Sequence, residues 1–414
     1  MPGLPPDGAT MPADGRLAAA GLDGLDRIPF GIYVHVPFCR TRCGYCDFNT
    51  YTAAELGGSG VSATASTYAG LAIEEIRFAR RVLGEPAPRV STVFFGGGTP
   101  TLLPPGELAA ILTAIGDEFG LAAGAEVTTE ANPDSVDARS LGELRAAGFT
   151  RVSFGMQSAV DHVLAVLDRS HTAGRPQQCV AWARAEGFAQ VSLDLIYGTP
   201  GESERDWERS LRGAIEAGPD HISAYALIVE DGTRLAARIR RGELAPPDDD
   251  EMADRYLAAD EAFSGAGLTW YEVSNWAAGA GDAGIGSVCR HNLLYWTGGN
   301  WWGAGPGAHS HVSGTRWWNV RHPSAYAARI TAGVSPGQAR EELTRAERRT
   351  ERIMLTTRLA SGCELAGLSA AGLRAAEVAV ADGLAECLPF EAGRLVLTVR
   401  GRLLADAVIR NLIG

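Results

Sequence analysis

The chain has 414 residues, 46% of them hydrophobic, and a formal net charge of −12. That length allows a large catalytic unit with an appended domain, and the acidic balance disfavours nucleic acid as a general partner. Only three of the seven cysteines cluster, which argues against a disulfide framework and for a reducing compartment. Because the sequence contains neither a signal peptide nor an apolar run of ~20 residues, we expect a cytoplasmic protein.

The chain begins with a segment rich in Pro, Gly and Asp, for which we expect disorder over residues 1–28. Short runs rich in β-branched and aromatic residues then alternate with helical segments such as 67–83 and 203–218. This alternation predicts an α/β fold over residues 29–245, a parallel sheet in the form of a partial barrel with six strand–helix units. The six predicted strands are 31–36, 91–95, 126–130, 151–154, 191–196 and 221–227.

The alternation ends near residue 235, and a Pro-rich hinge with an acidic turn then predicts a new helix within 246–267. A segment rich in tryptophan and glycine follows. We assign residues 246–340 to an interdomain region that contacts a bound ligand. Residues 341–414 predict a C-terminal α+β domain with a winged-helix-like unit. Its expected parts are helices and a short hairpin in LPFEAGRLVLTV, residues 388–399.

Three cysteines, Cys39, Cys43 and Cys46, lie close together directly after the first predicted strand, in the run CRTRCGYC. Strand carboxyl ends are where α/β sheets place their functional groups. A tetrahedral zinc site would need a fourth ligand, which His35 or Asp47 could supply. Three thiolates are better matched to a [4Fe–4S] cluster, because one iron stays open to chelate a small bidentate ligand.

The C-x3-C-x2-C spacing, with the aromatic Tyr45 before the last cysteine, resembles the radical S-adenosylmethionine (SAM) superfamily. In that superfamily, SAM binds the open iron through its methionine amine and carboxylate. The second strand ends in FFGGGTP, where glycines let the backbone approach a ligand closely. This run alone could be a simple tight turn. With the resemblance, it implies SAM contacts at Gly97, Gly98 and Thr99.

Four further polar residues lie at or just beyond successive strand ends, namely Glu130, Gln157, Arg169 and Asp194. Each of them alone could be a helix cap or a surface charge. Because the carboxyl ends of successive strands converge on one mouth, we expect the four side chains to meet there. Their motifs match, in order, the coproporphyrinogen-oxidase-like branch of radical SAM proteins, which also has a tyrosine near SAM at the position of Tyr33. The further SAM contacts that this resemblance implies are Tyr33, Tyr45, Glu130, Gln157, Arg169 and Asp194.

A third block, CRHNLLYW, places His291 beside Tyr295 and Trp296. By itself the block is typical of a Trp-rich core, and His291 of a hydrogen-bonded polar residue. Aromatic surroundings with one imidazole also suit a flat porphyrin whose iron takes an axial ligand. His309 and His311 are weaker candidates for such a ligand.

Together with YEVSNWA and GAGPGAHS, this block resembles the HemW-type haem chaperone family, over residues 29 to 412. The resemblance implies a [4Fe–4S] cluster, SAM and haem as cofactors, with His291 as the haem ligand. It also implies a haem-accepting partner protein, which could be membrane-associated. The alternative is a radical enzyme, coproporphyrinogen III dehydrogenase or a related methyltransferase, which would form a 5′-deoxyadenosyl radical at the same cluster.

Phe48 and the CRHNLLYW block, which belongs to the chaperone branch, are among the features that separate the two hypotheses. The oxidase pattern has a further cysteine where this chain has Phe48, which favours the chaperone. The sequence leaves open which protein accepts the haem, whether SAM is cleaved, and whether the chain forms a homodimer.

Overall fold

The computed structural model describes residues 7–17, 22, 24–56, 60–169, 171–172, 174–280 and 285–414, with side chains from residue 67 onward in the first long helix. The described strands form a 13-stranded sheet in the order β1-β13-β12-β11-β10-β2-β3-β4-β5-β6-β7-β9-β8. Its strands are β1 (Ala9–Thr10), β2 (Phe30–Val36), β3 (Val90–Gly97), β4 (Leu121–Ala131), β5 (Arg151–Gln157), β6 (Gln190–Tyr197), β7 (His221–Ala226), β8 (Leu268–Glu272), β9 (Asn275–Ala278), β10 (Asn300–Ala304), β11 (His309–Val312), β12 (Thr315–Asn319) and β13 (Gly337–Glu342).

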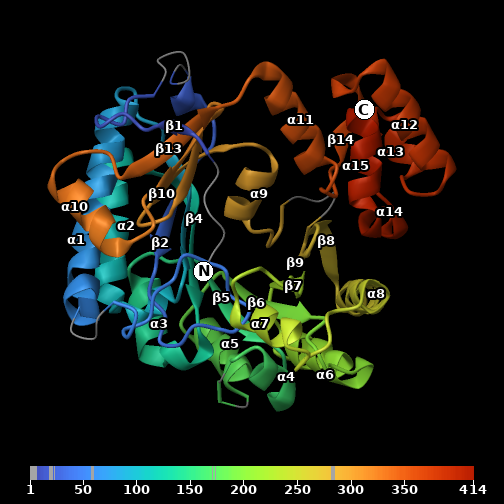
Figure 1. Cartoon of the computed structure of the whole chain (residues 1–414), viewed down its shortest axis with the longest axis horizontal. Helices are drawn as coiled ribbons and strands as arrows, with labels where there is room; N and C mark the ends of the chain where they lie inside the picture. Colours follow the sequence, from blue (N-terminus) through green and yellow to red (C-terminus); the bar gives the residue numbers. More distant parts are fainter. Residues whose placement is uncertain are drawn as a thin grey trace.

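The centre of this sheet is the predicted parallel unit. Strands β2 to β7 follow one another in chain order, each parallel to the next, and they correspond to the six strands predicted from sequence. Helices and short 3-10 turns connect them, as Figure 1 shows, so most of the strand residues are buried. The partial α/β barrel expected from the sequence is therefore confirmed as a mixed α/β fold around a parallel sheet.

The helices around the sheet carry apolar residues on one side. In α6, which begins with the capping box of Ser203 and Asp206, the buried positions Trp207, Leu211 and Ala214 recur at helical spacing. The helices up to residue 331 are α1 (Gly60–Leu83), α2 (Pro105–Phe119), α3 (Ala138–Ala146), α4 (Asp161–Val166), α5 (Arg175–Ala185), α6 (Glu204–Glu216), α7 (Arg234–Arg240), α8 (Asp249–Gly265), α9 (Arg290–Trp296) and α10 (Pro323–Thr331), with 3-10 turns at Leu25–Arg27, Pro100–Leu102 and Pro133–Ser135.

The Trp- and Gly-rich segment extends the sheet at both of its ends. β9 pairs antiparallel with β7 and β8 with β9, while β10 runs parallel to β2 with Trp301 opposite Gly31. The strands β11 to β13 then continue outward as antiparallel neighbours. The segment expected between domains therefore lies in the same sheet as the predicted barrel strands.

Part of the N-terminal segment is ordered, in contrast to the disorder expected over 1–28. β1 pairs antiparallel with β13, with Ala9 opposite Arg340, and Met11 and Leu17 are buried. The backbone groups of an edge strand are available for such pairing, which composition alone does not reveal. Residues 1–6, 18–21 and 23 lie outside the described part of the chain.

The C-terminal residues form a smaller unit with its own buried cluster, which includes Leu368, Leu395 and Leu412. Figure 1 shows its helices at one side of the molecule, beyond β8. The expected hairpin over 388–399 is wrong, because its first half is helical and β15 pairs instead with the distant β14. A winged-helix arrangement stays a prediction. The elements are α11 (Arg345–Thr356), β14 (Cys363–Glu364), a 3-10 turn (Leu365–Gly367), α12 (Ala370–Ala381), α13 (Cys387–Glu391), β15 (Arg394–Leu395), α14 (Val399–Leu403) and α15 (Ala405–Ile413).

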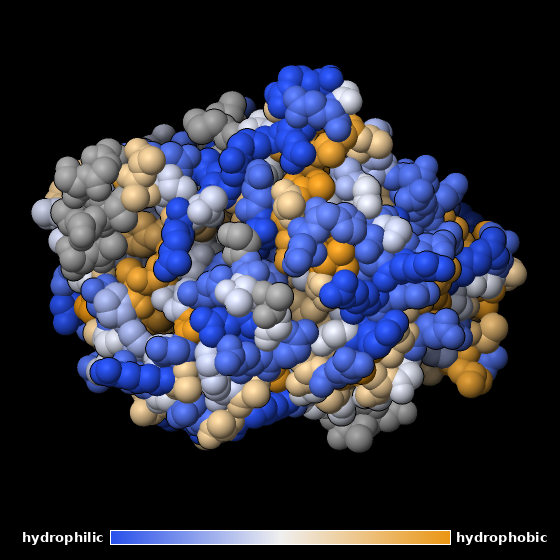
Figure 2. Space-filling model, turned by 90° about the horizontal axis from the view of Figure 1, so that it is seen from below, coloured by the Kyte–Doolittle hydropathy of each residue, from blue (hydrophilic) through white to orange (hydrophobic). Residues whose placement is uncertain are grey.

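Within the described residues, no helix combines the length and the apolar character that crossing a bilayer requires. Figure 2 shows the face seen from below, where hydrophilic side chains predominate and hydrophobic ones form smaller areas between them.

Candidate functional site

The cysteine loop after β2 is fixed by backbone hydrogen bonds to three other parts of the chain. The Cys39 N–H donates to the Tyr51 carbonyl (3.0 Å), and the Gly44 N–H donates to the Leu167 carbonyl (3.0 Å). The Gly44 carbonyl accepts from the Leu235 N–H (2.9 Å), at the beginning of α7. All three cysteines of the loop are half-buried free thiols, so the backbone holds the loop while the sulfur atoms stay available.

The three thiols fit an iron–sulfur cluster better than zinc. They line one cavity of about 830 Å³, and burial, followed by the other two thiols, raises the pKa of Cys39 to about 12. A bound metal would replace those protons, since thiolate is the ligating form. Arg169 donates from Nη1 to the Cys43 sulfur (3.6 Å), which places a cation beside the sulfur ligands. Three thiols with such a donor suit a [4Fe–4S] cluster.

The fourth ligand that zinc would need is not free at His35. Its Nδ1 lies 2.9 Å from the Tyr33 hydroxyl and its Nε2 lies 2.9 Å from the Asn49 carbonyl oxygen. Burial lowers the pKa of His35 to about 4, so the ring is neutral and held by both nitrogens at physiological pH. In the described part of the chain, no group of three His, Cys, Asp or Glu side chains is arranged to hold a single metal ion.

The glycine-rich turn after β3 packs directly against the beginning of the cysteine loop. The Gly98 N–H donates to the Val36 carbonyl (2.8 Å), and the Thr99 N–H donates to the Phe38 carbonyl (2.7 Å). A Cβ on Gly98 would lie 2.4 Å from the Phe38 oxygen, and Gly97 has a φ of 110°. Glycine is therefore required here by the close approach of two backbone segments as well as by the conformation.

The carboxyl groups of Glu130, near the end of β4, and of Asp194, within β6, lie close to each other in the same interior. Glu130 accepts a hydrogen bond from the Gly97 N–H (3.1 Å), and Asp194 accepts one from the Ser153 hydroxyl (3.0 Å). Burial, and then the nearby Asp194, raises the pKa of Glu130 to about 8. Burial also raises the pKa of Asp194. Such carboxyl groups can accept hydrogen bonds from ribose hydroxyls or from an amine, the role expected from the sequence.

Two buried polar atoms beside these carboxyl groups have no partner among the described residues. Gln157 Oε1 and Arg169 Nε make no hydrogen bond to any described residue, although Arg169 Nη2 donates to the Gly155 carbonyl (2.9 Å). Gln157 also has a φ of 63°, in the left-handed region that non-glycine residues rarely occupy. Unpartnered buried atoms and a strained backbone at a strand end are typical of a ligand site.

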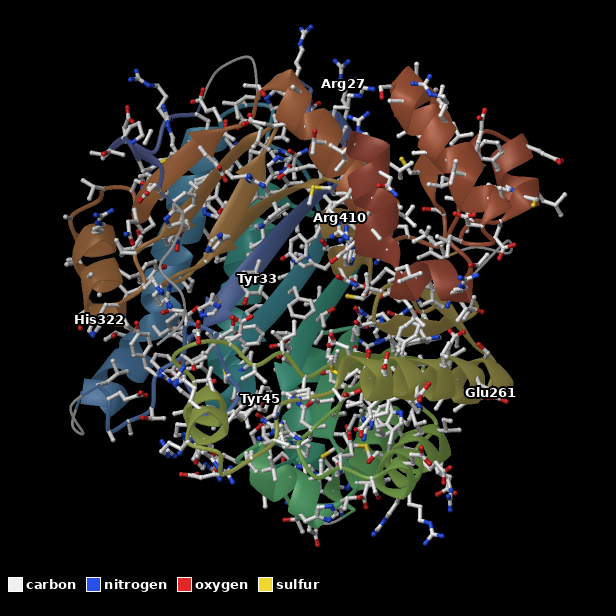
Figure 3. All side chains as sticks on the ribbon, turned by 45° about the vertical axis from the view of Figure 1, so that its right-hand side comes forward. Arg27, Tyr33, Tyr45, Glu261, His322 and Arg410 are labelled. Atoms are coloured by element: carbon white, nitrogen blue, oxygen red, sulfur yellow. The ribbon has the colours of Figure 1, made fainter. Side chains whose placement is uncertain are left out.

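The two tyrosines expected near SAM come from different elements. Figure 3 labels Tyr33, on β2, and Tyr45, on the cysteine loop. Tyr45 packs against the buried cluster that contains Leu167, Ile196 and Leu227, which anchors the middle of the loop. The cavity of about 830 Å³ is lined by every site residue expected from the sequence, namely Tyr33, Cys39, Cys43, Tyr45, Cys46, Gly97, Gly98, Thr99, Glu130, Gln157, Arg169, Asp194 and His291.

His291 lies in this cavity wall with both ring nitrogens engaged. Nδ1 lies 2.8 Å from the Thr92 hydroxyl on β3, and Nε2 lies 2.7 Å from the Tyr295 hydroxyl one turn further along α9. The ring stacks on Phe94 at 5.4 Å between centroids, and burial lowers its pKa to about 3. A haem iron could reach this imidazole only if one of the two hydrogen bonds broke. His291 as the haem ligand stays a prediction.

A second cavity, of about 790 Å³, lies against the first and shares Tyr33, Glu130 and Tyr295 with it. The sequence did not predict this cavity, whose other walls come from β10 to β12 and from α11. It also missed Asn49, which donates from Nδ2 to the carbonyls of Pro306 and Arg321 (2.9 Å each). An amide three residues after the last cysteine is the only local signal for this link.

Comparison with known proteins agrees with this geometry. Residues 33–213 match the model of the radical SAM superfamily. The chain is 53% identical over 394 residues to a protein of Mycobacterium tuberculosis named heme chaperone HemW. The alignment covers 95% of this chain and 97% of the relative. The chain belongs to the HemW-type haem chaperone family. A Bacillus subtilis protein with the same name is 32% identical, over 92% of this chain and 98% of its own length.

Among solved structures, that of coproporphyrinogen III oxidase (HemN) from Escherichia coli, a radical SAM enzyme, superposes with a TM-score of 0.80. The alignment covers 98% of this chain and 96% of that chain at 20% identity, so it shows a shared fold. The superfamily of this chain implies a [4Fe–4S] cluster and SAM, which the thiols, glycines and unpartnered polar atoms of the first cavity fit.

Proposed function

We propose that this chain binds haem together with a [4Fe–4S] cluster and SAM, and that it transfers the haem to an acceptor protein. The observation that carries the proposal is the 53% identity to a heme chaperone over nearly the full length of both chains. Two adjoining cavities support it, because one contains the three cysteines and the second is large enough for a further ligand. Ligand cavities in proteins are typically ~300–1,000 Å³.

In the first cavity we assign the cluster to Cys39, Cys43 and Cys46. When bound, the cluster supplies an open iron that can chelate the amino acid end of SAM. The residues of the chain then orient the rest of the ligand. Gly97 and Gly98 allow close approach of the backbone. Arg169 Nε can donate a hydrogen bond to the ligand, and Gln157 Oε1 can accept one. The SAM contacts that we propose are Tyr33, Tyr45, Gly97, Gly98, Thr99, Glu130, Gln157, Arg169 and Asp194.

The second candidate function is a radical enzyme that acts on a porphyrinogen, as the shared fold with HemN would allow. Phe48 argues against it. The side chain stands where the oxidase pattern has a further cysteine, it is 60% exposed, and it lines both cavities. A large apolar residue there offers haem a contact surface and offers iron no ligand.

One anaerobic experiment separates the two functions. The reconstituted protein is incubated with SAM, a reductant and coproporphyrinogen III, and the products are separated from any bound tetrapyrrole. In parallel, the same protein is titrated with haem. We expect haem binding at one equivalent without turnover. Protoporphyrinogen formation would instead establish the enzyme, and a failure to bind haem at defined stoichiometry would exclude the chaperone.

A further inference from the structure

The second cavity contains a histidine with the properties of an iron ligand. His309 begins β11, is exposed, and lines the cavity. Its imidazole makes no hydrogen bond to any described residue, whereas both ring nitrogens of His35, His291 and His311 are engaged. An axial ligand must offer iron a nitrogen lone pair, and His309 can do so without breaking a contact.

The surroundings of His309 suit a flat, dianionic molecule. Its ring stacks on Trp318 at 5.9 Å between centroids with an interplanar angle of 27°, and Trp301 lies on the neighbouring strand in the same wall. Arg316 and Arg321 line the same cavity, where their guanidinium groups can pair with carboxylates. Desolvation, followed by these two cations, lowers the pKa of His309, which keeps the ring in the neutral form that ligates iron.

Arg316 and Arg321 are themselves held in place. Arg316 forms ion pairs with Glu341 (2.8 Å) and Glu351, and Arg321 donates from Nε to Asn49 Oδ1 (3.4 Å). Asn49 follows the cysteine motif, so one of these cations is tied to the cysteine loop. Haem carries two propionate carboxylates on one edge. Arg321 can pair with one of them, and Arg316 can pair with the other by sharing its guanidinium with Glu341 and Glu351, the second of which also lines the cavity.

We propose that haem binds in this second cavity, with His309 as its axial iron ligand and Arg316 and Arg321 facing its propionates. The proposal rests on the proposed function, and it differs from the expectation that His291 is the ligand. In this position the porphyrin would contact Tyr33, Glu130 and Tyr295, which also line the first cavity. The three cysteines lie in that first cavity.

The same cavity opens toward solvent, as a transfer site must. Phe48 and Met354, which line it, are 60% and 39% exposed, and His309 is exposed as well. The other histidine considered, His291, is 1% exposed and lies in the wall of the first cavity. A haem held by His309 can therefore be reached by an acceptor protein without opening the sheet.

The test is a haem titration of the anaerobically reconstituted full chain, followed by optical and electron paramagnetic resonance spectra of the bound ferric haem. We compare His309→Ala and His291→Ala with His162→Ala, which removes an exposed histidine of α4 that lies outside both cavities. We expect His309→Ala to weaken haem binding at least tenfold and to change the spectrum of the axial ligand. Added imidazole should restore the spectrum. His162→Ala should match the wild type.

Each outcome is decisive. If the wild type binds haem at one equivalent and His309→Ala binds it equally with an unchanged spectrum, the assignment of His309 is wrong and the proposed function stands. If the wild type shows no stoichiometric binding, the proposed function itself fails. A loss of the axial spectrum in His291→Ala, with iron content and circular dichroism unchanged, would return the ligand role to His291. Cluster iron content, measured for every variant, distinguishes lost haem binding from lost folding.

Discussion

The hydroxyl of Tyr295 lies 2.7 Å from Nε2 of His291, four residues earlier on α9. The other ring nitrogen, Nδ1, lies 2.8 Å from the Thr92 hydroxyl on β3. The imidazole therefore connects α9 to β3 inside the wall of the cavity that contains the cysteines. The conspicuous histidine of the CRHNLLYW block thus has a structural role in the fold. Its surroundings predict effects on stability that a purely ligating side chain would not produce.

Replacing His291 by Ala should lower the free energy of unfolding by about 2–4 kcal/mol. The change leaves the buried Thr92 hydroxyl and the half-buried Tyr295 hydroxyl without their partner and opens space beside Phe94. Urea unfolding of the protein without cofactors measures the effect, with the exposed His162→Ala as the matched control. A variant as stable as the wild type would show that the two hydrogen bonds contribute nothing.

Replacing Cys43 by Ala should abolish cluster assembly. Only two thiols of the loop would remain, and Arg169 would lose the sulfur to which it donates. We expect the visible absorption and the iron content after anaerobic reconstitution to fall close to zero. Cys387→Ala, which removes an exposed thiol of the C-terminal unit, should reconstitute as the wild type does. A cluster that survives the loss of Cys43 would contradict the assignment of the three ligands.

Replacing Gly98 by Ala should damage both folding and SAM binding. The new Cβ would lie 2.4 Å from the Phe38 carbonyl oxygen, so the glycine-rich turn and the cysteine loop would have to move apart. We expect a loss of about 2 kcal/mol in stability and at least a tenfold weaker affinity for SAM. Differential scanning calorimetry and equilibrium dialysis measure these two effects.

The matched control for this substitution is Gly106→Ala. Gly106 lies in the first turn of α2, and a Cβ there would meet no atom within 4 Å. Alanine is the better helix former by up to about 1 kcal/mol, so this variant should be slightly more stable and bind SAM normally. Equal behaviour of the two alanine variants would mean that the close approach at Gly98 is unimportant.

The sequence predicted the parallel strands and their converging ends because both depend on local patterns. The composition of buried runs such as 191–196 is enough to predict strands. Parallel strands have their carboxyl ends at the same edge of the sheet, so Glu130, Gln157 and Asp194 come to line one cavity. The cysteine spacing is equally local, so the contents of the first cavity followed from the motifs.

What could not be predicted depends on contacts between distant segments. Nothing in the run NWWGA shows that β10 will pair in parallel with β2, about 270 residues earlier, and this pairing creates the second cavity. The pairing of β1 with β13 is similar, and it replaces expected disorder. The hairpin expected at 388–399 failed because β15 finds its partner in Cys363–Glu364. His309 and His291 differ only in what surrounds them, which the sequence does not display.

A buried carboxyl group, Glu75 of α1, gives a pH-dependent prediction. It accepts hydrogen bonds from the Gly305 N–H (2.7 Å), Asn319 Nδ2 (2.7 Å) and the Tyr326 hydroxyl (2.6 Å), and so ties α1 to the end of β10, to β12 and to α10. Burial raises its pKa from 4.5 to about 7, against the opposing effect of these donors. The folded state therefore holds this proton more tightly than the unfolded state.

The sign of the effect follows from that difference. The stabilising contribution of the proton is complete below pH 4.5 and is lost as the pH rises through about 7, because the folded protein must then bury a charge. At about 1.4 kcal/mol per pKa unit, the loss is on the order of 3 kcal/mol. We expect Glu75→Gln, which cannot ionise, to lack this part of the pH dependence, whatever its absolute stability.

The measurement is the free energy of unfolding in urea at intervals from pH 4.5 to 8, for the wild type and for Glu75→Gln. The buried histidines act in the opposite direction, since burial lowers the pKa of His35 and His291, but they are present in both proteins and cancel in the difference. Glu208→Gln, at an exposed position of α6, controls for the lost charge. Parallel pH curves for Glu75→Gln and the wild type would show that Glu75 titrates normally, and that its three donors outweigh the cost of burial.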